Sequence, residues 1–83
     1  METVDEPIIV IVSFNPSLSC KIRPIKFLWG KRAFEIKEIT YQWKTTEGRT
    51  VIHHFSVTDG GTLYEISFNS DTLLWKLEAL ETG

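Results

Sequence analysis

The stretch from residue 32 to residue 44, RAFEIKEITYQWK, constrains the fold more than any other part of the chain. Apolar and polar side chains alternate in both of its halves, which is the period of a strand with one buried face. The apolar positions are even before Lys37 and Glu38 and odd after them. A β-bulge at that point would turn both halves toward one core. The stretch therefore predicts one long, bent central strand with Ile36 and Trp43 on its core side.

Five further segments carry strand patterns, and short polar turns separate most of them. Residues 72–80 fit either a strand or a short helix, and a strand is favoured because it would close the sheet. The pairing partner of residues 8–14 stays open. The chain is thus predicted to be all-β: a six-stranded, curled antiparallel meander or a small SH3-like barrel, with residues 1–7 as an acidic flexible tail and residues 8–83 as one domain. The further strands are expected at residues 8–14, 25–29, 51–57, 64–68 and 72–80.

Length and composition limit the protein to one small globular domain. The chain has 83 residues, of which 42% are hydrophobic and 24% charged. Its one cysteine, Cys20, cannot form an internal disulfide, which favours a reducing cytoplasm. The acidic start of the chain and the short apolar run at residues 8–12 do not suit a secretion signal or a membrane span. We therefore expect a cytoplasmic protein that does not enter a membrane.

Proline, aromatic, branched and glycine residues recur in a particular order along much of the chain. They are Pro24, Ile25, Phe27, Trp29, Gly30, Phe34, Ile36, Ile39, Trp43, Phe55, Val57, Asp59, Tyr64, Ile66, Phe68, Trp75 and Leu77. This order resembles a family of short bacterial proteins of uncharacterised function. The resemblance covers residues 24–80 and implies a fold, but it brings no catalytic residues.

The residue types that carry chemistry are not arranged for catalysis. His53 and His54 are adjacent, so on a strand they point to opposite faces and cannot chelate one metal ion. Cys20 has no neighbouring thiol or histidine in the sequence that would activate it. We therefore expect no enzyme activity, no catalytic or metal-binding residues and no cofactor.

Charge is unevenly distributed along the chain, although the net charge is only −2. Basic residues gather between positions 21 and 37, close to a tryptophan, which is how small barrels bind single-stranded nucleic acid. An overall pI near 5.6 argues against that function. The favoured hypothesis is a non-catalytic protein-interaction module, and the alternative is a nucleic-acid-binding barrel. The candidate anion or nucleic-acid patch is Lys21, Arg23, Lys26, Trp29, Lys31 and Arg32.

Overall fold

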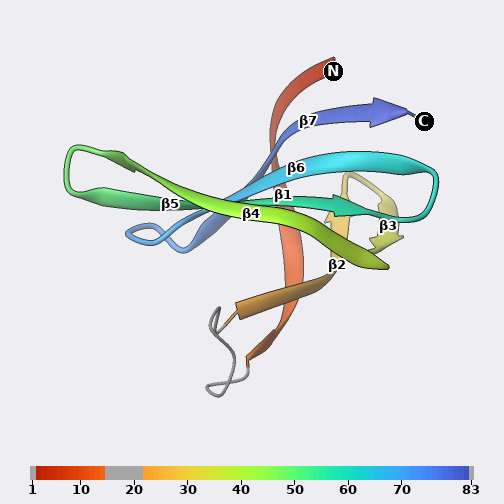
Figure 1. The fold of residues 1–83 in the computed structure, drawn as a ribbon, viewed down its shortest axis with the longest axis horizontal. Helices are drawn as coiled ribbons and strands as arrows, with labels where there is room; N and C mark the ends of the chain where they lie inside the picture. The colour runs from red at the N-terminus through yellow and green to blue at the C-terminus, as the bar shows by residue number, and fades with distance from the viewer. Residues whose placement is uncertain (1, 15–21, 83) are drawn as a thin grey trace.

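The computed structural model describes residues 2–14 and 22–82, which form seven antiparallel strands in one curled sheet (Figure 1). The order across the sheet is β3-β2-β1-β7-β6-β5-β4. The all-β prediction is confirmed for the described residues, and the last segment is a strand. The strands are β1 (Glu2–Phe14), β2 (Ile22–Trp29), β3 (Arg32–Glu35), β4 (Glu38–Glu47), β5 (Thr50–Thr58), β6 (Thr62–Asn69) and β7 (Leu74–Thr82).

Strand β1 joins two parts of the sheet. Its first half pairs with β7, ending at the Ile8 and Trp75 pair, and its second half pairs with β2 from Ile9 onward. Figure 1 shows β1 running across the strands β4 to β6. Residues 2–7, which were predicted to be a flexible tail, lie in the first half of β1. The open question of where residues 8–14 pair is thereby answered.

The predicted single central strand is two strands on opposite edges of the sheet. The amide of Ile36 donates to the Ile25 carbonyl of β2 at 3.0 Å, and the next amide, of Lys37, donates to the Thr58 carbonyl of β5 at 2.8 Å. The chain therefore passes from one edge of the sheet to the other between β3 and β4. The prediction of six strands was wrong for this reason, and the described strands do not close into a barrel, because β3 and β4 do not pair with each other.

The bulge that sets the faces of β4 lies later than predicted. Ile39 is opposite Val57 on the core side, but the register then shifts at Thr40. An extra residue in one strand reverses the faces that follow it. Trp43 is consequently opposite His54 and points away from the core, so its predicted core position was wrong.

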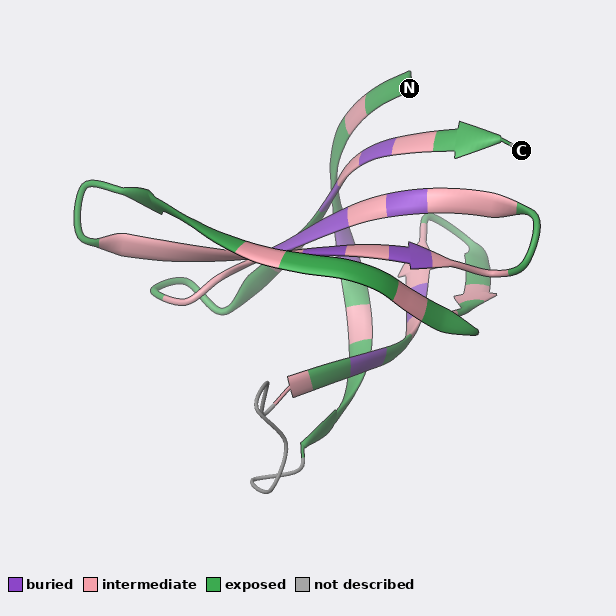
Figure 2. Cartoon of the chain, in the orientation of Figure 1, coloured by how far each residue is buried: buried purple, intermediate pink, exposed green. Residues whose placement is uncertain are grey.

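The core lies between the two parts of the sheet that β1 connects (Figure 2). Phe27 of β2 is fully buried, stacks on Phe34 at 5.1 Å and meets Tyr64 of β6 edge-on at 5.0 Å. These aromatic contacts hold the β2–β3 hairpin against β6. The remaining buried apolar side chains are Ile8, Pro24, Phe55, Val57, Ile66, Leu77 and Ala79.

The turn between β5 and β6 is organised by one carboxylate. Asp59 accepts hydrogen bonds from the amides of Gly61 and Thr62 at 3.0 and 2.9 Å and from the Tyr64 hydroxyl at 3.1 Å. These bonds, led by the one from Gly61, lower the pKa of Asp59. Gly60 has φ +105°, a backbone conformation that residues other than glycine rarely adopt. Residues 59–61 thus form the turn of the β5–β6 hairpin.

Candidate functional site

The surface of the sheet that faces away from the core carries a continuous row of side chains from five strands. We call this surface the outer face. The pairing registers place these residues directly beside one another from β1 to β4. In order along the row they are Pro7, Lys76, Ser67, His54 and Trp43.

The β4 end of the row is aromatic. The ring of Trp43 stacks on His54 with 5.0 Å between centroids and 5° between planes, and Tyr41 stacks on Trp43 at 5.5 Å. The Oγ1 of Thr45 lies 2.8 Å from Nε2 of His54. The other ring nitrogen, Nδ1, is buried and has no hydrogen-bond partner among the described residues. Stacking and the Thr45 contact therefore fix the orientation of the imidazole.

The β7 end of the row is ionic. The ammonium of Lys76 lies 2.8 Å from a carboxylate oxygen of Asp5 and 3.5 Å from one of Glu78. The Ser67 hydroxyl donates to Glu78 at 3.1 Å. The hydrogen bond to Asp5 is the main reason that the pKa of Lys76 is raised. Because Lys76 and Asp5 are largely exposed, we expect these ion pairs to orient the side chains more than they stabilise the fold.

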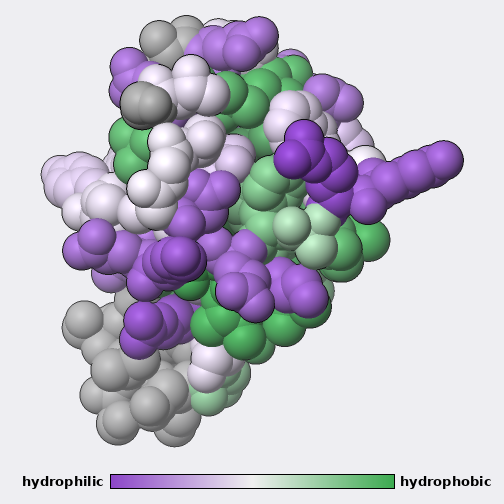
Figure 3. Space-filling view, turned by 90° about the vertical axis from the view of Figure 1, so that its right-hand side faces the viewer, coloured by the Kyte–Doolittle hydropathy of each residue, from purple (hydrophilic) through white to green (hydrophobic). Residues whose placement is uncertain are grey.

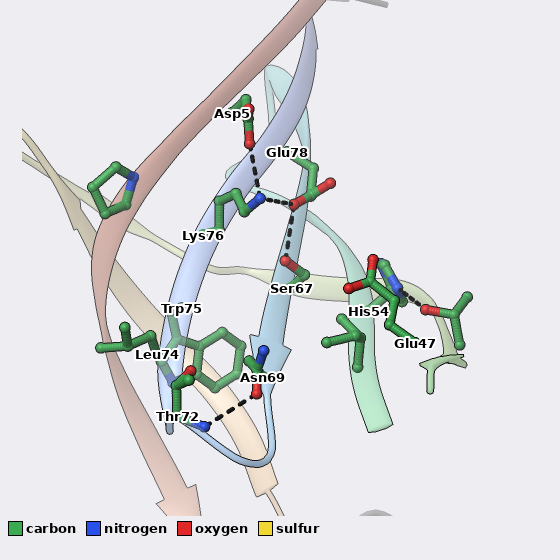
Figure 4. A pocket seen from close by; sticks show the side chains of 13 residues that line it. Asp5, Glu47, His54, Ser67, Asn69, Thr72, Leu74, Trp75, Lys76 and Glu78 are labelled. Carbon is green, nitrogen blue, oxygen red and sulfur yellow. Dashed lines mark hydrogen bonds and ion pairs between the residues drawn. The ribbon is translucent and has the colours of Figure 1, made fainter. Parts of the chain in front are cut away.

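A pocket of about 430 Å³ opens between these two ends of the outer face (Figure 4). Both polar and apolar side chains form its wall, and they come from β1, β4, β5, β6, β7 and the β6–β7 turn. The labelled side chains in Figure 4 surround a common space, with Lys76, Glu78 and Ser67 joined by dashed contacts. The lining residues are Asp5, Pro7, Thr45, Glu47, Ile52, His54, Ser67, Asn69, Thr72, Leu74, Trp75, Lys76 and Glu78.

The residues of the predicted basic patch do not share one surface in the structure. Lys26 is opposite Glu35 on the side of β2 that faces away from Phe27. Trp29 is opposite Arg32 on the core side, where it packs partly against the core. The Arg32 guanidinium lies 5.2 Å from the Phe34 ring centre, a cation–π contact that covers this ring.

The remaining members of the predicted patch are either exposed or outside the described residues. Arg23 and Lys31 are exposed, at the start of β2 and in the β2–β3 turn. Lys21 and Cys20 lie outside the described residues.

The two adjacent histidines point to opposite faces, as the alternation predicts. His53 is opposite Phe68, with 6.2 Å between the ring centroids, whereas His54 is on the outer face. Burial is the main reason that the pKa of His53 is lowered, with the nearby charge of Lys44 as a second cause. Within residues 2–14 and 22–82, no group of three or more His, Cys, Asp or Glu side chains could hold a metal ion.

Part of the apolar surface of β1 is not covered by other described residues. Ile9 and Phe14 are 66% and 67% exposed, and Ile11 is 44% exposed. Figure 3 shows hydrophobic side chains reaching the surface between hydrophilic ones on one side of the molecule. This surface is distinct from the pocket, whose β1 residues are Asp5 and Pro7.

Comparisons with family models, with curated proteins and with solved structures found no match for this chain. The resemblance to short bacterial proteins therefore stays a prediction. Among the described residues there is no helix of the length and apolar character needed to cross a membrane.

Proposed function

We propose that this protein is a non-catalytic interaction module that accepts an extended segment of a partner protein as an added strand along β4. The observation that carries this proposal is the position of β4. It has ten residues, lies at the edge of the sheet and pairs with β5 alone among the described strands. One side of its backbone is thus free to donate and accept hydrogen bonds.

The geometry of β4 beyond its bulge supports strand addition. From Tyr41 to Glu47 the pairing with β5 runs without a further shift, so this part of the edge has a regular outer backbone. Tyr41 is 63% exposed on the outer face and offers an aromatic surface to the side chains of an added strand. In strand addition the backbone ladder supplies affinity and the alternate side chains supply specificity.

Binding of nucleic acid has less support as a proposal. Base stacking needs an accessible aromatic ring within a basic groove. Trp29 packs partly against the core, and Arg32 already covers the Phe34 ring. Lys26 faces the other side of the sheet.

Selection from a library of random nine-residue peptides on the immobilised protein tests the proposal. We expect recovered peptides to bind with the β4 backbone, because an added strand would occupy its free hydrogen-bonding groups. Hydrogen exchange of amides between residues 41 and 47 should then slow in the complex, whereas the amides of β1 and β2 should not change.

A matched pair of variants distinguishes peptide binding at the β4 edge from non-specific binding to exposed apolar side chains. Tyr41→Ala should weaken peptide binding by roughly tenfold, the size of an aromatic contact at an interface. Phe14→Ala removes an aromatic side chain of similar exposure, 67%, that lies on β1 away from the β4 edge and outside the pocket, and it should leave affinity unchanged. Equal losses in both variants, or protection on β1 and β2 in place of β4, would contradict strand addition.

A further inference from the structure

The pocket on the outer face has an excess of negative charge. Its wall holds three carboxylates, those of Asp5, Glu47 and Glu78, against the single ammonium of Lys76. Asp5 and Glu78 both contact that ammonium. Glu47 has no ion pair among the described residues, so its carboxylate is the one of the three that no described cation contacts.

Among the charged side chains of the wall, the one that no described cation contacts is an acceptor, the Glu47 carboxylate. The one ammonium is already held by two carboxylates, and the Ser67 hydroxyl donates to Glu78. A wall of this kind suits a ligand group that only donates hydrogen bonds, and ammonium and guanidinium groups have no acceptor.

The size and the apolar part of the wall suit a short aliphatic chain. A volume of about 430 Å³ falls in the range of small-molecule sites. Pro7, Ile52 and Leu74 supply apolar surface beside the carboxylates. Leu74 is 68% exposed, so a ligand that covers it would remove apolar surface from water.

We propose that this pocket binds an organic cation, an ammonium or guanidinium group on a short methylene chain, with Glu47 as the principal counter-charge. The cation is either a free amine or the side chain of an arginine or lysine in a partner. The methylene chain lies against Ile52 and Leu74. The proposal does not depend on strand addition at β4, because the pocket wall is complete in the free protein.

Titration of the full chain with agmatine, followed by amide chemical shifts, tests the proposal. Agmatine carries a guanidinium and an ammonium group on a four-carbon chain. We expect saturable binding with a Kd on the order of 1 mM. The largest shift changes should come from amides of the pocket wall on β4, β5 and β7. The neutral analogue 1,4-butanediol should give no saturable binding at the same concentrations.

The source of the cation is read from a second titration with the capped tripeptide acetyl-Gly-Arg-Gly-amide. Tighter binding of the peptide would assign the pocket to a protein side chain, and tighter binding of agmatine would assign it to a free amine. Both results support the cation site. Failure of both ligands to saturate, or equal binding of butanediol, would overturn it.

Two variants of β4 localise the counter-charge. Glu47→Gln should weaken agmatine binding roughly fivefold, as expected for the loss of one partly exposed charge pair. Glu38→Gln removes the same charge from an exposed position of the same strand outside the pocket and should change the affinity little. Equal weakening in both variants would mean that only the general charge of the protein is sensed, and would overturn the assignment to the pocket. Because this titration uses no strand-forming peptide, its result is independent of the test of β4.

Discussion

Replacing Phe27 by alanine is expected to lower the free energy of unfolding by about 3 to 5 kcal/mol, the usual cost of truncating a buried phenylalanine. Phe27 has no exposed surface, and its ring contacts both Phe34 and Tyr64. The substitution would leave a cavity where the β2–β3 hairpin meets β6. A domain of this length has a total stability of roughly 4 to 12 kcal/mol, so the variant should be partly or wholly unfolded.

Urea denaturation of Phe27→Ala beside Trp43→Ala checks this prediction. Trp43 is the larger side chain, but it lies on the outer face and contacts His54 and Tyr41 instead of the core. Its removal should cost no more than about half as much, since mainly aromatic pairing is lost. A greater loss of stability in Trp43→Ala than in Phe27→Ala would show that Trp43 packs in the core. It would thereby contradict the placement of the β4 bulge.

The second large effect is expected at Leu77 in β7, where alanine should cost about 2 to 5 kcal/mol. Leu77 has no exposed surface and lies opposite Ile66 of β6 on one side and Glu6 of β1 on the other. Its loss would weaken the packing at the point where the first and last strands meet.

The neighbouring Lys76→Ala variant is the matched control for Leu77→Ala. Lys76 is on the opposite face, and its side chain is 48% exposed, so losing its ion pairs should cost less than about 1 kcal/mol. Thermal unfolding of both variants measures the difference. Similar melting temperatures would show that Leu77 is not part of the core.

Alternation in the sequence was sufficient to predict β5 and β6, which pair with each other locally. In β5 and β6 the core-facing residues Phe55, Val57, Tyr64 and Ile66 are those that share one phase of the pattern. The turn that joins them is short and has glycines where they are needed, so the neighbouring strand is also the partner strand.

Two features could not be read from alternation because they depend on distant parts of the chain. A phase change shows that an extra residue exists somewhere, but the register with β5 decides that it lies at Thr40. Similarly, the apolar run of β1 indicates a strand without naming its partners, which are β2 and β7.

The outer-face pocket was not predicted, because its members come from five strands and look like ordinary exposed residues in the sequence. Thr45 and Glu47 lie beyond the strand predicted at residues 32–44, whereas both belong to β4. Asp5 was assigned to a flexible tail, whereas it contacts Lys76 of β7. Only the sheet order brings these side chains together.

Pairing between β1 and β7 joins the two parts of the sheet and places Asp5 and Pro7 in the pocket wall. Nuclear Overhauser effects between backbone protons of the two strands measure it directly. Contacts should be found between Ile8 and Trp75 and between Pro7 and Lys76, the pairs in register. Absence of these contacts, with β7 showing backbone contacts to β6 alone, would contradict the sheet order and the pocket built on it.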